Sequence, residues 1–90
     1  MPNATRGELW LVDLGYQAEE RAIVTYVLRT RSVHGTQYEI PHVMRGMLDG
    51  AFDAQGLGSI PEVKLERRLG VVDDSIMKSV EAAVRRWLAL

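Results

Sequence analysis

The chain has 90 residues, of which 47% are hydrophobic and 26% are charged, and its formal net charge at pH 7 is −1. This length predicts one domain over residues 1–90, and the composition excludes a largely disordered chain. The net charge excludes a global positive field that attracts nucleic acid, so any contact with RNA must come from a local basic patch.

The first predicted strand covers residues 7–14. Trp10, Val12 and Leu14 alternate with the other side chains and form a uniformly apolar set. This alternation indicates a strand that buries Trp10 and its two companions in the core.

A second strand and a short third one follow. Residues 21–28 are rich in β-branched and aromatic side chains and are predicted to form a buried strand. Residues 29–36 are polar and basic and form a loop. Residues 37–40 are a short strand candidate, which Pro41 restricts to an edge or an end of a sheet.

The middle of the chain is rich in glycine. Residues 42–58 hold four of the eight glycines, which indicates a loop with one or two short strands inside it. Residues 57–60 are one such strand candidate, and Pro61 ends it. Residues 62–69 fit either a short helical turn or an edge strand, and the pattern does not separate the two.

The clearest predicted element is a C-terminal helix over residues 74–88. Apolar side chains recur there at three- and four-residue steps and form one face, which includes Trp87 and predicts that it packs in the core. Asp73 precedes the helix and is expected to accept hydrogen bonds from the first helical turn. Short strands followed by one amphipathic helix predict an α+β fold, with the helix packed on a small antiparallel sheet or barrel.

Several kinds of chemistry find no support in the sequence. His34 and His42 have no partners at metal-ligand spacing, and no phosphate-binding glycine motif occurs, so we expect neither a metal nor another cofactor. The absence of cysteine excludes disulfides and fits a cytoplasmic protein. No apolar run approaches the roughly 20 residues that cross a bilayer, so we expect no membrane contact.

The loop at residues 29–36 has the composition of a phosphate-binding segment. Arg29 and Arg31 can bind phosphate oxygens, hydroxyl groups can donate to them, and His34 can transfer a proton near neutral pH. The alternative is a solvated hairpin loop with ordinary surface charge, and composition alone favours it.

Four segments together carry a resemblance to a known family. Residues 6–14, Arg-Gly-Glu-Leu-Trp-Leu-Val-Asp-Leu, resemble the N-terminal motif of MazF/PemK-type toxins. Residues 51–61 resemble a subgroup pattern near the family's last barrel strands. Residues 65–70 and 80–88 resemble its C-terminal part.

The resemblance implies an SH3-like antiparallel barrel with a C-terminal helix, and a homodimer. It implies a metal-independent, sequence-selective endoribonuclease that cleaves single-stranded RNA through the substrate's own 2′-hydroxyl. It also implies a cognate antitoxin as partner, and binding to operator DNA through the antitoxin complex.

The resemblance places a catalytic threonine or serine at the end of the second predicted strand, which is Thr30 here. The family's catalytic arginine lies in an Arg-Pro motif that this chain lacks, and about one strand is missing between Gly15 and Arg21. Three explanations are open. The polypeptide has residues that the sequence lacks, the chain is a natural or engineered deletion, or Arg21 or Arg29 replaces the missing arginine.

We expect the RNA to be contacted by side chains of the basic loop and of the segment at residues 51–61, namely Arg31, Ser32, His34, Gln55 and Ser59. The alternative function is a degenerate, non-catalytic module that binds nucleic acid or an antitoxin with the same fold. A purely structural dimerisation domain is a third possibility.

Overall fold

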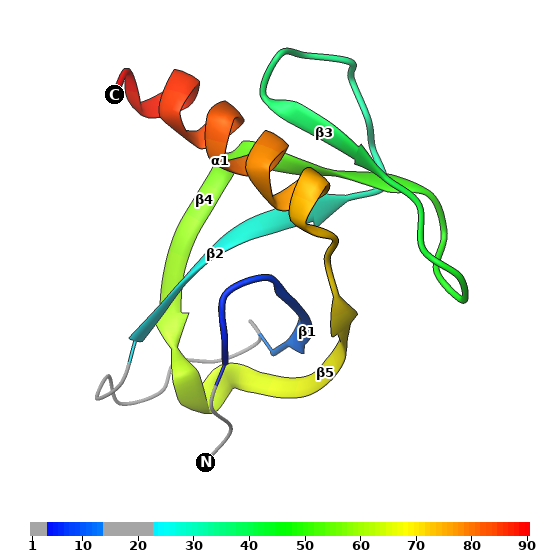
Figure 1. The fold of residues 1–90 in the computed structure, drawn as a ribbon. Coiled ribbons are helices and arrows are strands. Elements are labelled where there is room, and N and C mark those ends of the chain that lie inside the picture. Colours follow the sequence, from blue (N-terminus) through cyan, green and yellow to red (C-terminus); the bar gives the residue numbers. More distant parts are fainter. Residues whose placement is uncertain (1–3, 14–22) are drawn as a thin grey trace.

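The computed structural model describes residues 4–13 and 23–90, and it combines antiparallel strands with one C-terminal helix (Figure 1). The elements are β1 (Glu8–Val12), β2 (Ile23–Thr30), β3 (Glu39–His42), β4 (Gly50–Pro61), the 3-10 helix η1 (Glu62–Lys64), β5 (Leu65–Val71) and α1 (Asp74–Leu88). β1 pairs with β5, and β2, β4 and β3 form a second sheet in that order. The predicted α+β class is confirmed. The strands of the described part form these two sheets and do not close into one barrel.

Leu14, Arg21 and the gap predicted between Gly15 and Arg21 lie outside the described residues. The three explanations for the missing arginine therefore stay open. The catalytic role of Arg21 stays a prediction.

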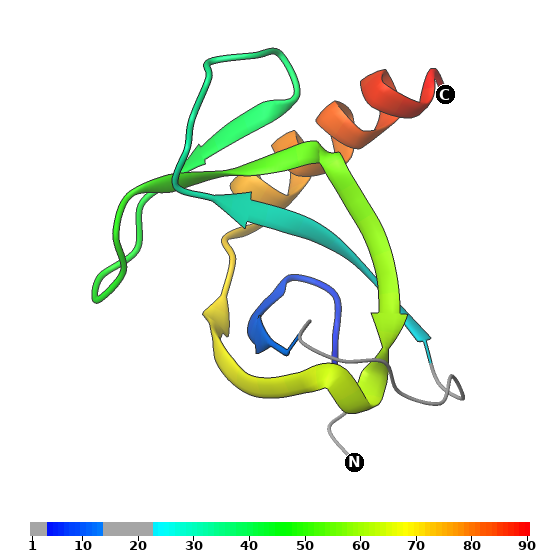
Figure 2. The same ribbon diagram turned by 180° about the vertical axis from the view of Figure 1, so that it is seen from behind.

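β4 is the longest strand and pairs with β2 on one side and β3 on the other (Figure 2). The prediction that residues 42–58 are mostly loop is wrong for their second half. Gly56 and Gly58 are there for close packing, because a Cβ at either would lie 2.7 Å from the side chain of Leu28 or Tyr26, respectively. A strand glycine marks such a close approach as readily as a turn.

The predicted burial of β1 and β2 is corrected by the structure. In β1, Leu9 is buried and Trp10 only half-buried, because register shifts between Leu9 and Trp10 and again before Val12 break the strict alternation. β2 is not a buried strand, since it packs one face on the core and leaves Ile23 and Leu28 exposed.

Two uncertain regions are resolved. β3 contains Pro41 and lies at an edge of its sheet, as the proline predicts. Residues 62–69 hold both predicted alternatives in succession, because the helical turn η1 leads directly into β5.

Helix α1 has the predicted bounds and packs on β3 and β4 (Figure 1). Val80 joins Leu9, Phe52 and Val72 in the core. Asp73 takes the predicted N-cap position but makes no side-chain capping bond. The predicted burial of Trp87 is wrong: its ring is 44% exposed and packs edge-on against Tyr38, with centroids 5.4 Å apart. Within the described ranges, no helix has both the length and the apolar character to cross a bilayer.

Candidate functional site

The candidate site lies at the end of β2, where two neighbouring residues face opposite ways. Arg29 pairs with Phe52 of β4, a core residue, and Thr30 pairs with Ala51. Successive side chains of a strand point to opposite faces of the sheet. Arg29 therefore lies on the face that packs on the core, and Thr30 lies on the outer face.

The Arg29 guanidinium is bound on the core face. Its Nε donates to Nδ1 of His42 at 2.9 Å, and its Nη2 donates to the carbonyl oxygens of His42 at 3.0 Å and Leu48 at 2.9 Å. These bonds join the two ends of the loop at residues 43–49. The structure thus does not bring the guanidinium to the Thr30 hydroxyl, and a catalytic role for Arg29 stays a prediction.

Gly50 makes this arrangement possible. A Cβ at this position would lie 2.5 Å from the carbonyl oxygen of Thr30 and 2.8 Å from Nη1 of Arg29. Any side chain at Gly50 would push β4 away from the end of β2. This glycine therefore allows the strand and the guanidinium to approach each other closely.

His42 is a buried residue whose contacts the sequence did not indicate. Its ring lies 4.7 Å from that of Phe52, centroid to centroid. Burial, followed by the positive charge of Arg29, lowers the pKa of His42, while Asp73 acts in the opposite direction. The neutral form is favoured, and it leaves Nδ1 free to accept from Arg29.

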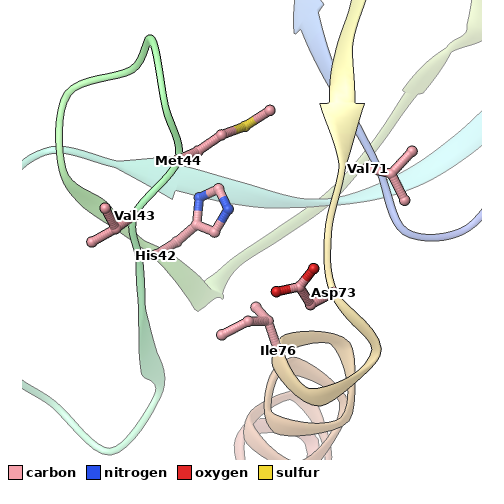
Figure 3. Close-up of a pocket in the computed structure, with 6 residues that line it drawn as sticks. All are labelled: His42, Val43, Met44, Val71, Asp73 and Ile76. Carbon is pink, nitrogen blue, oxygen red and sulfur yellow. The ribbon is translucent and has the colours of Figure 1, made fainter.

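A pocket of about 350 Å³ adjoins His42, between the segment that follows β3 and the start of α1 (Figure 3). Its lining is mostly apolar, with His42 and Asp73 as the titratable groups; the lining residues are His42, Val43, Met44, Val71, Asp73 and Ile76. It lies on the core side of the sheet, away from Thr30.

Thr30 begins the loop at residues 31–38. Its Oγ1 accepts a hydrogen bond from the backbone N–H of Ser32 at 3.0 Å, which turns the chain out of the strand. Arg31, Ser32 and His34 are all exposed in this loop. The structure therefore brings Thr30 together with three of the five residues predicted to contact RNA.

Glu39 holds the other end of this loop. Its carboxylate accepts the backbone N–H of Thr36 at 2.7 Å and that of His34 at 3.0 and 3.2 Å, one distance for each oxygen. These bonds, first from His34 and then from Thr36, hold the pKa of Glu39 below its usual value despite burial.

The other two predicted RNA contacts lie on β4 and are exposed. The N–H of Gln55 donates to Oδ1 of Asp53 at 2.9 Å, a local bond typical of a bend in the chain. Ser59 lies 3.3 Å from the hydroxyl of Thr25, at the far end of β2. Five residues of strand separate Thr25 from Thr30, or roughly 16 Å, so Ser59 is remote from Thr30.

Metal-binding side chains do not gather at this site. In the part of the chain that the structure describes, no three His, Cys, Asp or Glu side chains lie close enough together to hold an ion. What the site does offer is a hydroxyl, exposed cationic and imidazole side chains and a loop held at both ends.

Solved structures share this arrangement of elements. An endoribonuclease from a mycobacterial species, solved in complex with its cognate antitoxin, superposes with a TM-score of 0.83, covers 98% of this chain and 97% of its own, and is 22% identical. The chain has the fold of an endoribonuclease. A second mycobacterial endoribonuclease has a TM-score of 0.83 at 20% identity, over 100% of this chain and 95% of that one. No protein-family model matches the sequence, and no curated protein does either.

Proposed function

We propose that this protein is the toxin of a toxin–antitoxin pair and cleaves single-stranded RNA without a metal ion. The observation that carries the proposal is the likeness, over almost the whole of both chains, to a mycobacterial endoribonuclease solved with its antitoxin. The resemblance of the sequence to MazF/PemK-type toxins supports it independently, because that resemblance rests on residues and not on the fold.

The chemistry proposed is an internal displacement at phosphorus. The 2′-oxygen of the substrate attacks the adjacent phosphorus as its proton is removed, and the 5′-oxygen of the next nucleotide leaves with a proton. The products are a 2′,3′-cyclic phosphate and a 5′-hydroxyl. The protein needs only to transfer protons and to stabilise the charge on the phosphate oxygens.

Each role has a candidate residue near the end of β2. The Thr30 hydroxyl donates to a phosphate oxygen, Arg31 and Ser32 bind the backbone, and His34 transfers a proton. Because Arg29 is bound to His42 and Leu48, we favour Arg21 as the replacement for the family's missing arginine. Gln55 and Ser59 contact nucleotides further along the strand.

The partners proposed are those that the family resemblance implies. They are a second copy of this chain, a cognate antitoxin, and operator DNA bound through the antitoxin complex. Exposed apolar side chains of β2, among them Ile23 and Leu28, are consistent with a further protein surface covering part of this sheet.

The test is incubation of the purified protein with a long single-stranded RNA, with and without EDTA, followed by mapping of the new ends. We expect discrete cleavage sites, cyclic phosphate ends and the same rate in EDTA. A 2′-deoxy nucleotide at a mapped site should block cleavage there. Loss of cleavage in EDTA would contradict the metal-independent mechanism.

The bound state of Arg29 favours a second candidate function, a module that binds RNA or an antitoxin without cutting. It predicts an intact RNA under all these conditions, with binding that weakens as salt rises because phosphate contacts release counterions. An intact mass of 10.1 kDa would show that no further strand is present in the polypeptide.

A further inference from the structure

Glu39 is a buried carboxylate beneath an exposed loop. Only 7% of the residue is accessible, at the first position of the edge strand β3. All the hydrogen bonds to its carboxylate come from the backbone of the loop at residues 31–38 within the described part of the chain, from the N–H groups of His34 and Thr36. An edge carboxylate thus organises loop backbone, where most acidic side chains on a sheet edge face water.

The loop has one anchor at each end. At its start, the N–H of Ser32 bonds the hydroxyl of Thr30 at 3.0 Å. At its end, Glu39 binds two loop N–H groups on either side of Gly35, whose φ of 71° gives the left-handed turn between them. The side chains between these anchors, Arg31 to His34, are exposed.

We propose that Glu39 is a positioning residue for RNA: it fixes the backbone of the loop at residues 31–38 and thereby aims Arg31, Ser32 and His34 relative to Thr30. This inference rests on the proposed function. Glu39 does not touch the substrate, because it is buried and its negative charge would repel phosphate. It acts through the loop, so its removal loosens RNA binding while Thr30 stays in place on β2.

The charge of Glu39 makes the inference testable by its sign. Removing a negative charge next to a basic loop should by electrostatics alone tighten RNA binding. Loss of the anchor should weaken it. Glu39→Gln keeps the shape and removes the charge, Glu39→Asp keeps the charge on a shorter side chain, and Glu66→Gln removes the same charge from an exposed position of β5.

The experiment measures loop order and RNA binding separately for these variants. Hydrogen exchange on the protein alone follows the amides of His34 and Thr36. Affinity is measured with a 2′-O-methyl RNA that spans a mapped cleavage site, or with a mixed-sequence pool if the protein does not cleave. Steady-state cleavage gives KM and kcat.

For Glu39→Gln we expect exchange at both amides and KM to rise about tenfold each, with kcat within about threefold of the parent. Glu39→Asp should lie between the parent and Glu39→Gln, and Glu66→Gln should match the parent. In the parent, both amide shifts should follow a single acid titration that Glu39→Gln abolishes.

Three results would overturn the inference: unchanged exchange at His34 and Thr36, faster exchange with unchanged RNA affinity, or tighter binding by Glu39→Gln. A parent that does not cleave RNA overturns the enzymatic proposal alone. Its affinity for the 2′-O-methyl pool then decides the role of Glu39, and a parent that does not bind the pool overturns that role too.

Discussion

The two faces of the sheet at the end of β2 differ in what holds their side chains. On the core face, Arg29 is bound to His42 and to the carbonyl oxygen of Leu48. On the outer face, Thr30 makes one local bond to Ser32 and opens onto an exposed loop. Two adjacent residues therefore have separate tasks, and substitutions on the core face should cost stability whereas those on the outer face should cost activity.

The largest effect is expected on the outer face. Thr30→Ala should lower the cleavage rate by about 10² to 10⁴-fold, because it removes the hydroxyl proposed to act at the reacting phosphate. Thr30→Ser should keep much of the rate, and Thr30→Val, which has the same shape, should behave like alanine. Single-turnover cleavage measures all three. A Thr30→Val protein as fast as the parent would remove Thr30 from the mechanism.

On the core face, Arg29→Leu should lower the free energy of unfolding by about 2 kcal/mol, because it leaves Nδ1 of His42 and two carbonyl oxygens without their donor. Urea unfolding measures this loss. Arg67→Leu, at an exposed position of β5, should change the stability by less than about 0.5 kcal/mol. Equal effects of the two substitutions would show that the bonds of Arg29 contribute nothing.

The contact between the strands is tested by Gly50→Ala, which should cost about 2 kcal/mol, since the added Cβ meets the backbone carbonyl of Thr30. Gly70→Ala is a matched control: its Cβ meets only the methyl end of Met44, which can move aside. Thermal unfolding of both variants should show the larger loss for Gly50→Ala. The reverse order would contradict the close approach of β2 and β4.

The smallest effect is a pH dependence. Because the pKa of His42 is lowered in the folded protein, the unfolded chain takes up a proton first as the pH falls through about 6.5. The stability that neutral His42 provides is complete above this pH and declines below it. His42→Asn, whose amide oxygen can still accept from Arg29, should flatten the decline between pH 7 and 5.5. Parallel pH profiles of unfolding would contradict this assignment.

The sequence predicts the parts of this molecule that depend on local periodicity. The bounds of α1 follow from its apolar face, and the edge position of β3 follows from Pro41. β4 was missed because Gly50, Gly56 and Gly58 indicate a loop, although each one makes room for an atom of β2. That reason is tertiary and leaves no local signal.

The candidate site shows the same limit. Thr30 and the basic loop could be identified from residue types and from the family resemblance. The separation of Arg29 from Thr30 depends on which face of β2 meets the core, and the role of Glu39 depends on how the loop folds back over β3. Neither follows from composition, because both require the pairing of β2 with β4.

The central claim is that the outer face at Thr30 cuts RNA while the core face at Arg29 supports it. The most direct measurement is the rate of cyclic phosphate formation from one defined single-stranded RNA in EDTA, by the parent and by Thr30→Ala of equal thermal stability. The account predicts cyclic phosphate ends from the parent and a rate at least about 100-fold lower for the variant. Equal rates, or no cyclic phosphate from the parent, would contradict it.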